Sequence, residues 1–177
     1  MKQLRIPYED FQIAPQDFSL IQFPDQTLKF TNDIAFFTEE IRTYFPQEID
    51  GFMNLLEHIK NFNEVNLSNE TVMAKTVVSH FIKNEALVEM IFCPLLIYGS
   101  AWENDMDFSQ FVIMFKSIFL EGFGRPRGGV RTIIDLLLKK LEESQAEIRF
   151  KAEVTRILSK DGKITGVEIN GEETILC

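Results

Sequence analysis

The stretch GFGRPRGG, residues 122–129, decides the fold, because it separates two parts of the chain that have different sequence patterns. It places four glycines and one proline within eight residues, directly before segment 130–143, where apolar residues recur at helical spacing. Glycine adopts backbone angles that other residues avoid and lets the backbone approach a ligand closely. The pattern predicts a loop that leads into a helix. The loop fits either binding of an anionic or electron-rich group or a helix entry that needs special backbone angles.

The chain after this helix has the pattern of short strands. Segments 147–150, 153–158, 163–169 and 173–176 are rich in strand-forming residues. Asp161-Gly162 and Asn170-Gly171 are dipeptides that two-residue hairpin turns prefer. We therefore expect hairpins in this part of the chain.

The chain before the stretch begins with a predicted hairpin and continues as helices. Alternating segments on either side of Pro24-Asp25-Gln26 predict a hairpin over about 17–31. Apolar spacing and capping residues then predict helices over 33–45, from Pro46 to about Phe62, from Ser68 onward, over 85–97 and after Asp107. The segment 85–97 is almost wholly apolar, so this helix should be buried. The fold class is therefore α+β, with a helical part and a small mixed β-sheet region.

Phenylalanine and charge are distributed unevenly along the chain. Sixteen of its 17 phenylalanines lie between Phe11 and Phe123. Residues 1–120 contain 8 Lys and Arg against 17 Asp and Glu, whereas residues 121–177 contain 10 of each, so the net charge of −9 belongs to the first part. An acidic chain without a basic block argues against a nucleic-acid partner. We place a domain boundary between residues 122 and 123.

Residues that could carry out catalysis are few. His58 and His80 lie on separate predicted helices, and Cys93 stands in the most apolar one, where an inert buried thiol is expected. No metal-ligand spacing and no GxGxxG motif is found, so the sequence assigns no metal site and no catalytic residue. Two cysteines without a disulfide pattern fit a reducing, cytoplasmic location, and neither a signal peptide nor a membrane span is visible.

The order of motifs resembles a known enzyme family. Pro126–Gly129 gives P-x-G-G, and a helix, a strand at 146–148, V-x-x-I at Val154–Ile157, Gly162–Val167 and Asn170-Gly171-Glu172 follow in order. This series resembles the phytoene desaturase-like FAD-dependent oxidoreductases, which include carotenoid desaturases and isomerases and retinol saturases, within the flavin amine-oxidase superfamily. Phe23–Thr27 matches more loosely, and together the resemblance spans roughly residues 15–176.

The resemblance implies a role for several residues. The backbone of Val154 would contact the FAD adenine, and the loop residues Arg127, Gly128 and Gly129 would stand between the FAD domain and the substrate cavity. Residues 1–122 would form a substrate-binding subdomain and residues 123–177 part of an FAD/NAD(P)-binding-like fold. The expected substrate is an apolar, polyene- or lipid-like molecule. Its expected contacts are Phe108, Phe111, Phe115 and Phe119.

Two departures from the family pattern limit what the chain is expected to do alone. The GxGxxG strand and helix and the segment that completes the flavin site are missing, so we expect an interior fragment that is inactive itself and does not bind FAD by itself. An apolar surface would also allow peripheral membrane contact or homo-oligomerisation. Two other hypotheses stay open. The chain could be a non-enzymatic module that binds an apolar ligand or a partner, or its phenylalanines could simply be core residues or residues exposed by truncation.

Overall fold

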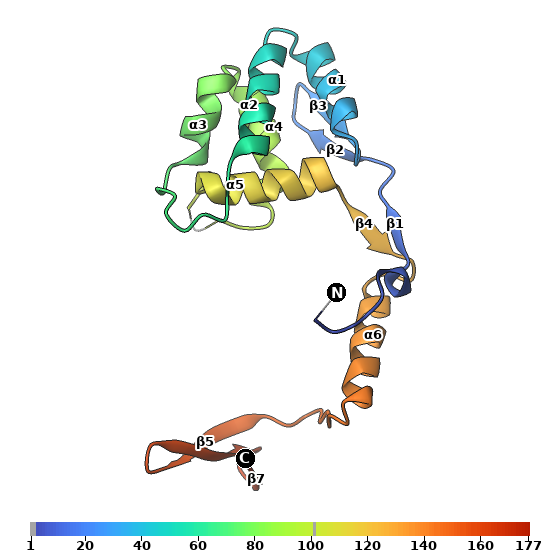
Figure 1. Ribbon diagram of the computed structural model, residues 1–177, viewed down its shortest axis with the longest axis vertical. Coiled ribbons are helices and arrows are strands. Elements are labelled where there is room, and N and C mark those ends of the chain that lie inside the picture. The colour runs from blue at the N-terminus through green and yellow to red at the C-terminus, as the bar shows by residue number, and fades with distance from the viewer. Residues whose placement is uncertain (1–2, 101) are drawn as a thin grey trace. The chain divides into compact units, whose positions relative to one another are not determined.

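The computed structural model describes residues 3–100 and 102–177 and divides them into two compact units (Figure 1). The larger unit is Phe11–Val130, and the smaller unit combines the residues up to Asp10 with Arg131–Cys177. The division at residues 130 and 131 lies eight residues beyond the predicted boundary. The roles assigned to the two parts remain predictions. The α+β class is confirmed, and the strands of all three sheets pair antiparallel where a mixed region was expected.

A hairpin and a capped helix open the larger unit. The predicted hairpin is confirmed, because β2 (Ser19–Gln22) pairs with β3 (Thr27–Phe30). Helix α1 (Ile34–Tyr44) begins directly after Asp33, whose carboxylate accepts a hydrogen bond from the Ala35 N–H at 2.9 Å.

Four further helices follow, and all except the third begin close to their predicted positions. They are α2 (Ile49–Asn61), α3 (Ala74–Phe81), α4 (Glu85–Leu96) and α5 (Phe108–Phe115), and α5 continues as a π-helix over Lys116–Glu121. The predicted start of the third helix near Ser68 is wrong. The backbone before α3 is instead bonded to the chain ahead of α5: Phe108 donates to the Val72 carbonyl and Ala74 to the Met106 carbonyl, both at 2.8 Å.

Phenylalanine rings fill the core of the larger unit. Seven of them are almost completely buried: Phe30, Phe37, Phe52, Phe92, Phe111, Phe115 and Phe119. Phe37 of α1 stacks on Phe119 with 4.7 Å between ring centroids and 10° between ring planes. Most of α4 is buried, as its apolar sequence predicts. Phenylalanine is therefore concentrated in this part of the chain mainly because its rings form one aromatic core.

The glycine-rich stretch contains a strand that the sequence did not indicate. Predicted as a loop, residues 122–129 include β4 (Gly124–Pro126), which pairs with β1 (Ile13–Pro15). Asn32 adjoins this pairing: its side-chain amide donates to the Phe123 carbonyl at 2.8 Å and accepts from the Phe123 N–H at 2.9 Å. A long-range contact thus converts part of the loop into a strand.

The smaller unit consists of most of α6 (Val130–Glu143) and the sheet β5-β6-β7. The strands β5 (Val154–Lys160), β6 (Lys163–Ile169) and β7 (Glu173–Leu176) follow three of the four predicted segments, but residues 147–150 are irregular. Positive φ angles at Asp161, Gly162, Asn170 and Gly171 confirm the two predicted turns. Helix α6 has no buried residue. In the part of the chain that the structure describes, no helix has the length and apolarity needed to cross a membrane.

Candidate functional site

The phenylalanines predicted to bind substrate lie together along one helix. Phe111, Phe115 and Phe119 are at most 1% exposed and form a chain of ring contacts, with centroids 5.8 Å apart for the first pair and 4.9 Å for the second. Phe108 is 5% exposed. The rings of Phe111, Phe115 and Phe119 belong to the aromatic core. Contact with a substrate remains a prediction for all four phenylalanines.

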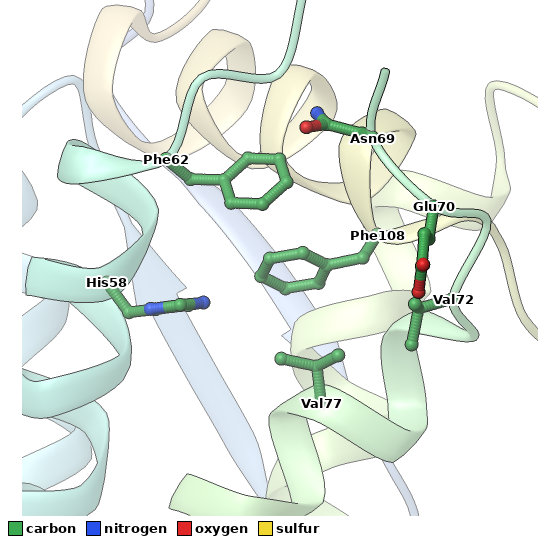
Figure 2. A pocket seen from close by; sticks show the side chains of 7 residues that line it. All are labelled: His58, Phe62, Asn69, Glu70, Val72, Val77 and Phe108. Carbon is green, nitrogen blue, oxygen red and sulfur yellow. The ribbon is translucent and has the colours of Figure 1, made fainter. Parts of the chain in front are cut away.

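Phe108 reaches the wall of a cavity of about 260 Å³, which we call the aromatic pocket. Its other lining residues come from the end of α2, the segment between α2 and α3, and α3 itself: His58, Phe62, Asn69, Glu70, Val72 and Val77 (Figure 2). The Phe62 and Phe108 rings meet edge to face at 5.0 Å and 79°, and the His58 ring lies 5.5 Å from Phe108. His58 therefore packs among aromatic rings.

A second cavity, of about 230 Å³, lies between the hairpin and the end of α4, and we call it the hairpin pocket. Its lining is mainly apolar and includes Leu20, Ile21, Phe30, Ile97, Tyr98 and Phe123. Leu20 is 55% exposed, Ile97 77% and Tyr98 61%. Apolar side chains this exposed at a cavity mark a surface that can bind an apolar ligand.

The local sequence explains why these side chains stand free. Helix α4 ends at Leu96, and Gly99 follows with φ of +95°, so Ile97 and Tyr98 lie beyond the last helical turn. Phe123 is fixed on the other side, because Asn32 bonds both of its backbone groups and its ring lies 6.4 Å from Tyr98. The walls of the hairpin pocket thus come from three separate segments of the chain.

Cys93 also lines the hairpin pocket. It is half-buried rather than fully buried as the sequence suggested. The reason is its place on the last turns of α4, on the side that the hairpin covers only in part.

The loop predicted to face the cofactor follows Phe123 closely. Arg127 is four residues further along, and an extended strand rises about 3.3 Å per residue, so the loop begins within about 13 Å of the pocket wall. Gly128 and Gly129 have φ of +79° and +70°, and the Gly129 N–H donates to the Pro126 carbonyl at 2.8 Å. The Arg127 N–H donates to the Gln12 carbonyl at 3.1 Å. Gly128 and Gly129 add no side chain of their own, which suits close approach of a ligand, and the Arg125 guanidinium lies 3.6 Å from the place of a Cβ on Gly129.

Val154, the residue expected at the FAD adenine, begins the edge strand β5. The Glu153 carbonyl accepts from the Asn170 N–H at 2.8 Å, and the Glu153 N–H donates to the Asn170 side chain at 3.0 Å. Backbone groups alternate in direction along an antiparallel strand, so those of Val154 point away from β6, toward the open edge. This geometry fits contact with a ligand through the backbone.

The carboxyls with shifted pKa values belong to ion pairs on the surface. A hydrogen bond from Lys116 lowers the pKa of Glu64, and one from Arg149 lowers the pKa of Glu173. Neither carboxyl lines the two pockets described above. Among the described residues, no group of three or more His, Cys, Asp or Glu could hold a metal ion.

Comparison with known proteins shows similarity to a distant relative. The chain is 26% identical over 186 residues to a phytoene desaturase (neurosporene-forming) from Rhodobacter capsulatus. The match covers 91% of this chain and 35% of the relative, so the chain spans about a third of the relative's length. No family model matches the chain. The similarity agrees with the resemblance seen in the motif series.

Apart from Phe108, His58 and Cys93, the sequence did not single out the residues of either pocket. In the sequence, nothing distinguishes Leu20, Ile97 and Tyr98 from apolar residues that are buried in the core. Only the structure shows that their side chains are exposed. One available signal was the continuation of the apolar run of α4 past its last turn to Tyr98, just before a glycine.

Proposed function

We propose that this chain forms part of an FAD-dependent oxidoreductase of the phytoene desaturase type, and that its hairpin pocket contacts an apolar, polyene- or lipid-like substrate. The similarity to a phytoene desaturase along 91% of the chain supports the first part of this proposal. The observation that carries the second part is the apolar lining of the hairpin pocket, with Leu20, Ile97 and Tyr98 largely exposed.

The chain offers residues for both substrate and cofactor. The open backbone groups of Val154 would hold the adenine, and the side-chain-free Gly128 and Gly129 would permit close approach of the cofactor. Bound FAD would supply the acceptor for the electrons and hydrogen removed from the substrate. The hairpin pocket would orient the substrate and exclude water through Leu20 and Tyr98, so no acid–base set within the chain is required.

The substrate role of the pocket can be tested in the protein encoded by the complete reading frame that contains these 177 residues. That protein is loaded with FAD, kept without oxygen and mixed with a conjugated polyene, and flavin reduction is followed by its absorption. Leu20→Asp should slow the reduction, because a carboxylate in the pocket must be desolvated when an apolar substrate enters. Leu67→Asp introduces the same change at a fully exposed position outside the pocket and should have no effect. Equal rates for the two variants would exclude this pocket.

A non-enzymatic module that binds an apolar ligand is the second candidate. The apolar hairpin pocket favours it equally, and the sequence lacks a GxGxxG motif. This alternative predicts the same sensitivity to Leu20→Asp in ligand binding, but a protein that takes up no flavin.

A further inference from the structure

The aromatic pocket combines aromatic rings with one carboxylate, and the proposed function does not use it. Phe62 lies edge to face against Phe108, and His58 lies beside both rings, with centroids 6.2 Å from Phe62 and 5.5 Å from Phe108. Figure 2 shows the Glu70 side chain on the opposite side of Phe108 from His58. The exposed Glu70 carboxylate therefore lies at the rim of an aromatic cavity.

The negative charge around the aromatic pocket disfavours an anionic ligand. Glu70 lines the pocket, and neither Lys nor Arg is among its lining residues. The nearest lysine along α5 and its continuation, Lys116, is already paired with Glu64 at 2.8 Å. Residues 1–120 as a whole carry 17 acidic against 8 basic residues. An anionic ligand would meet repulsion from Glu70 and from the surrounding surface.

The residues that line the aromatic pocket indicate which chemical class of ligand fits it. A divalent metal ion needs several oxygen ligands, and a single carboxylate does not provide them. A neutral apolar ligand would gain no attraction from the Glu70 carboxylate at the rim of the cavity. An organic cation avoids both problems, because aromatic rings attract a cation electrostatically and its alkyl groups pack against Val72 and Val77. We propose that the aromatic pocket binds a small organic cation with a substituted ammonium group, of the choline type.

Choline and its neutral carbon isostere, 3,3-dimethylbutan-1-ol, test this proposal with the 177-residue chain. The two molecules have nearly the same shape and differ in the positive charge. Titration calorimetry should give a dissociation constant for choline at least about fivefold lower than for the isostere, because the cation–π attraction and the Glu70 charge act only on choline. Equal affinities would overturn the proposal, and so would absence of binding both of free choline and of the same group in a lipid.

Substitution of the carboxylate locates the site. Glu70→Gln should weaken choline binding by about threefold or more, in line with the modest strength of exposed charge pairs. Glu57→Gln is the matched control, because Glu57 is an exposed carboxylate on α2 that does not line the pocket. If the two variants weaken binding equally, the effect comes from the general field of the protein, and the proposal fails.

The same cation could come from solution or from a lipid headgroup, and vesicles of phosphatidylcholine distinguish the two sources. Co-sedimentation that Glu70→Gln reduces and Glu57→Gln does not would assign the headgroup as ligand. Choline binding without co-sedimentation would assign the free cation. Both results support the cation site, whereas absence of binding in both assays contradicts it.

Discussion

The side chain of Asn32 bonds both backbone groups of Phe123, a residue 91 positions later in the chain. Asn32 also accepts a hydrogen bond from the Gln16 side chain at 2.8 Å, and the Gln16 N–H donates to the Phe123 carbonyl at 3.0 Å. These contacts join the start of β4, the residues after β1 and the end of the hairpin. They fix the segment from which Phe123 forms one wall of the hairpin pocket.

Gly122 should be the most sensitive glycine of this junction. It has φ of +80°, and a Cβ placed on it would overlap the Asn32 side-chain amide. Gly122→Ala should therefore destabilise the larger unit by more than the ~1–2 kcal/mol expected from the left-handed backbone alone. The measurement is urea unfolding followed by the fluorescence of Trp102, the one tryptophan of the chain, which lies in the larger unit.

Gly99→Ala is the matched control for this substitution. Gly99 has φ of +95°, but nothing lies within 4 Å of a Cβ built on it. Gly99→Ala therefore costs the free energy of a left-handed backbone but introduces no overlap between the new Cβ and another residue. If Gly99→Ala and Gly122→Ala lower stability equally, the contact with Asn32 has no part in holding Phe123.

Phe119 should behave as a core residue. Its ring is 1% exposed and packs against Phe37, Phe30 and Phe115. Phe119→Ala should cost about 3–5 kcal/mol in the same unfolding experiment, because a buried ring is lost and a cavity remains. Phe36→Ala removes a ring that is 36% exposed and should cost clearly less. A loss below about 1 kcal/mol for Phe119→Ala would mean that the core does not depend on this ring.

The ion pair between Lys116 and Glu64 should make a contribution to stability that depends on pH. The hydrogen bond from Lys116 lowers the pKa of Glu64 below its ordinary value in the folded chain. The stabilisation is therefore present above the pKa of the unfolded chain and is lost as the pH falls through the lower pKa of the folded one. A double-mutant cycle with Glu64→Gln and Lys116→Met should show coupling near about pH 7 that becomes smaller near about pH 3, as the Glu64 carboxylate begins to take up a proton. Equal coupling at both pH values would contradict the assignment.

The hairpin pocket should bind an apolar probe in the 177-residue chain itself. A fluorescent polyene fatty acid should bind with an affinity that Leu20→Asp lowers by about tenfold, because the new carboxylate loses hydration when the probe enters. Leu67→Asp is the control, since Leu67 is fully exposed and lies outside the pocket. Binding that is equally strong in both variants would place the probe elsewhere on the chain.

Local patterns predicted much of the fold correctly. Asp161-Gly162 and Asn170-Gly171 form their turns because the left-handed angles there depend on those residues alone. Helix α1 begins directly after Asp33, within one residue of its predicted start, because capping by this side chain is also local. The pairing of β1 with β4 could not be predicted in this way. Each strand has three residues, and their contact depends on segments more than 100 positions apart.

Most residues that line the hairpin pocket could not be predicted from local sequence patterns, for a similar reason. The resemblance implied that Phe111, Phe115 and Phe119 contact a substrate. Their rings lie in the core, as apolar side chains often do, and contact with a substrate stays a prediction. Leu20 and Tyr98 line the hairpin pocket because the tertiary structure leaves them uncovered, and sequence periodicity does not report that. The P-x-G-G loop was found from sequence because its glycines adopt positive φ angles, and glycine is the residue type that the sequence shows at such positions.

Flavin uptake tests the central proposal most directly. The protein encoded by the complete reading frame that contains these 177 residues is purified, incubated with FAD and freed of unbound cofactor, and its visible absorption is recorded. We expect the spectrum of a protein-bound oxidised flavin. A folded protein that remains colourless after this treatment would contradict the assignment to an FAD-dependent oxidoreductase.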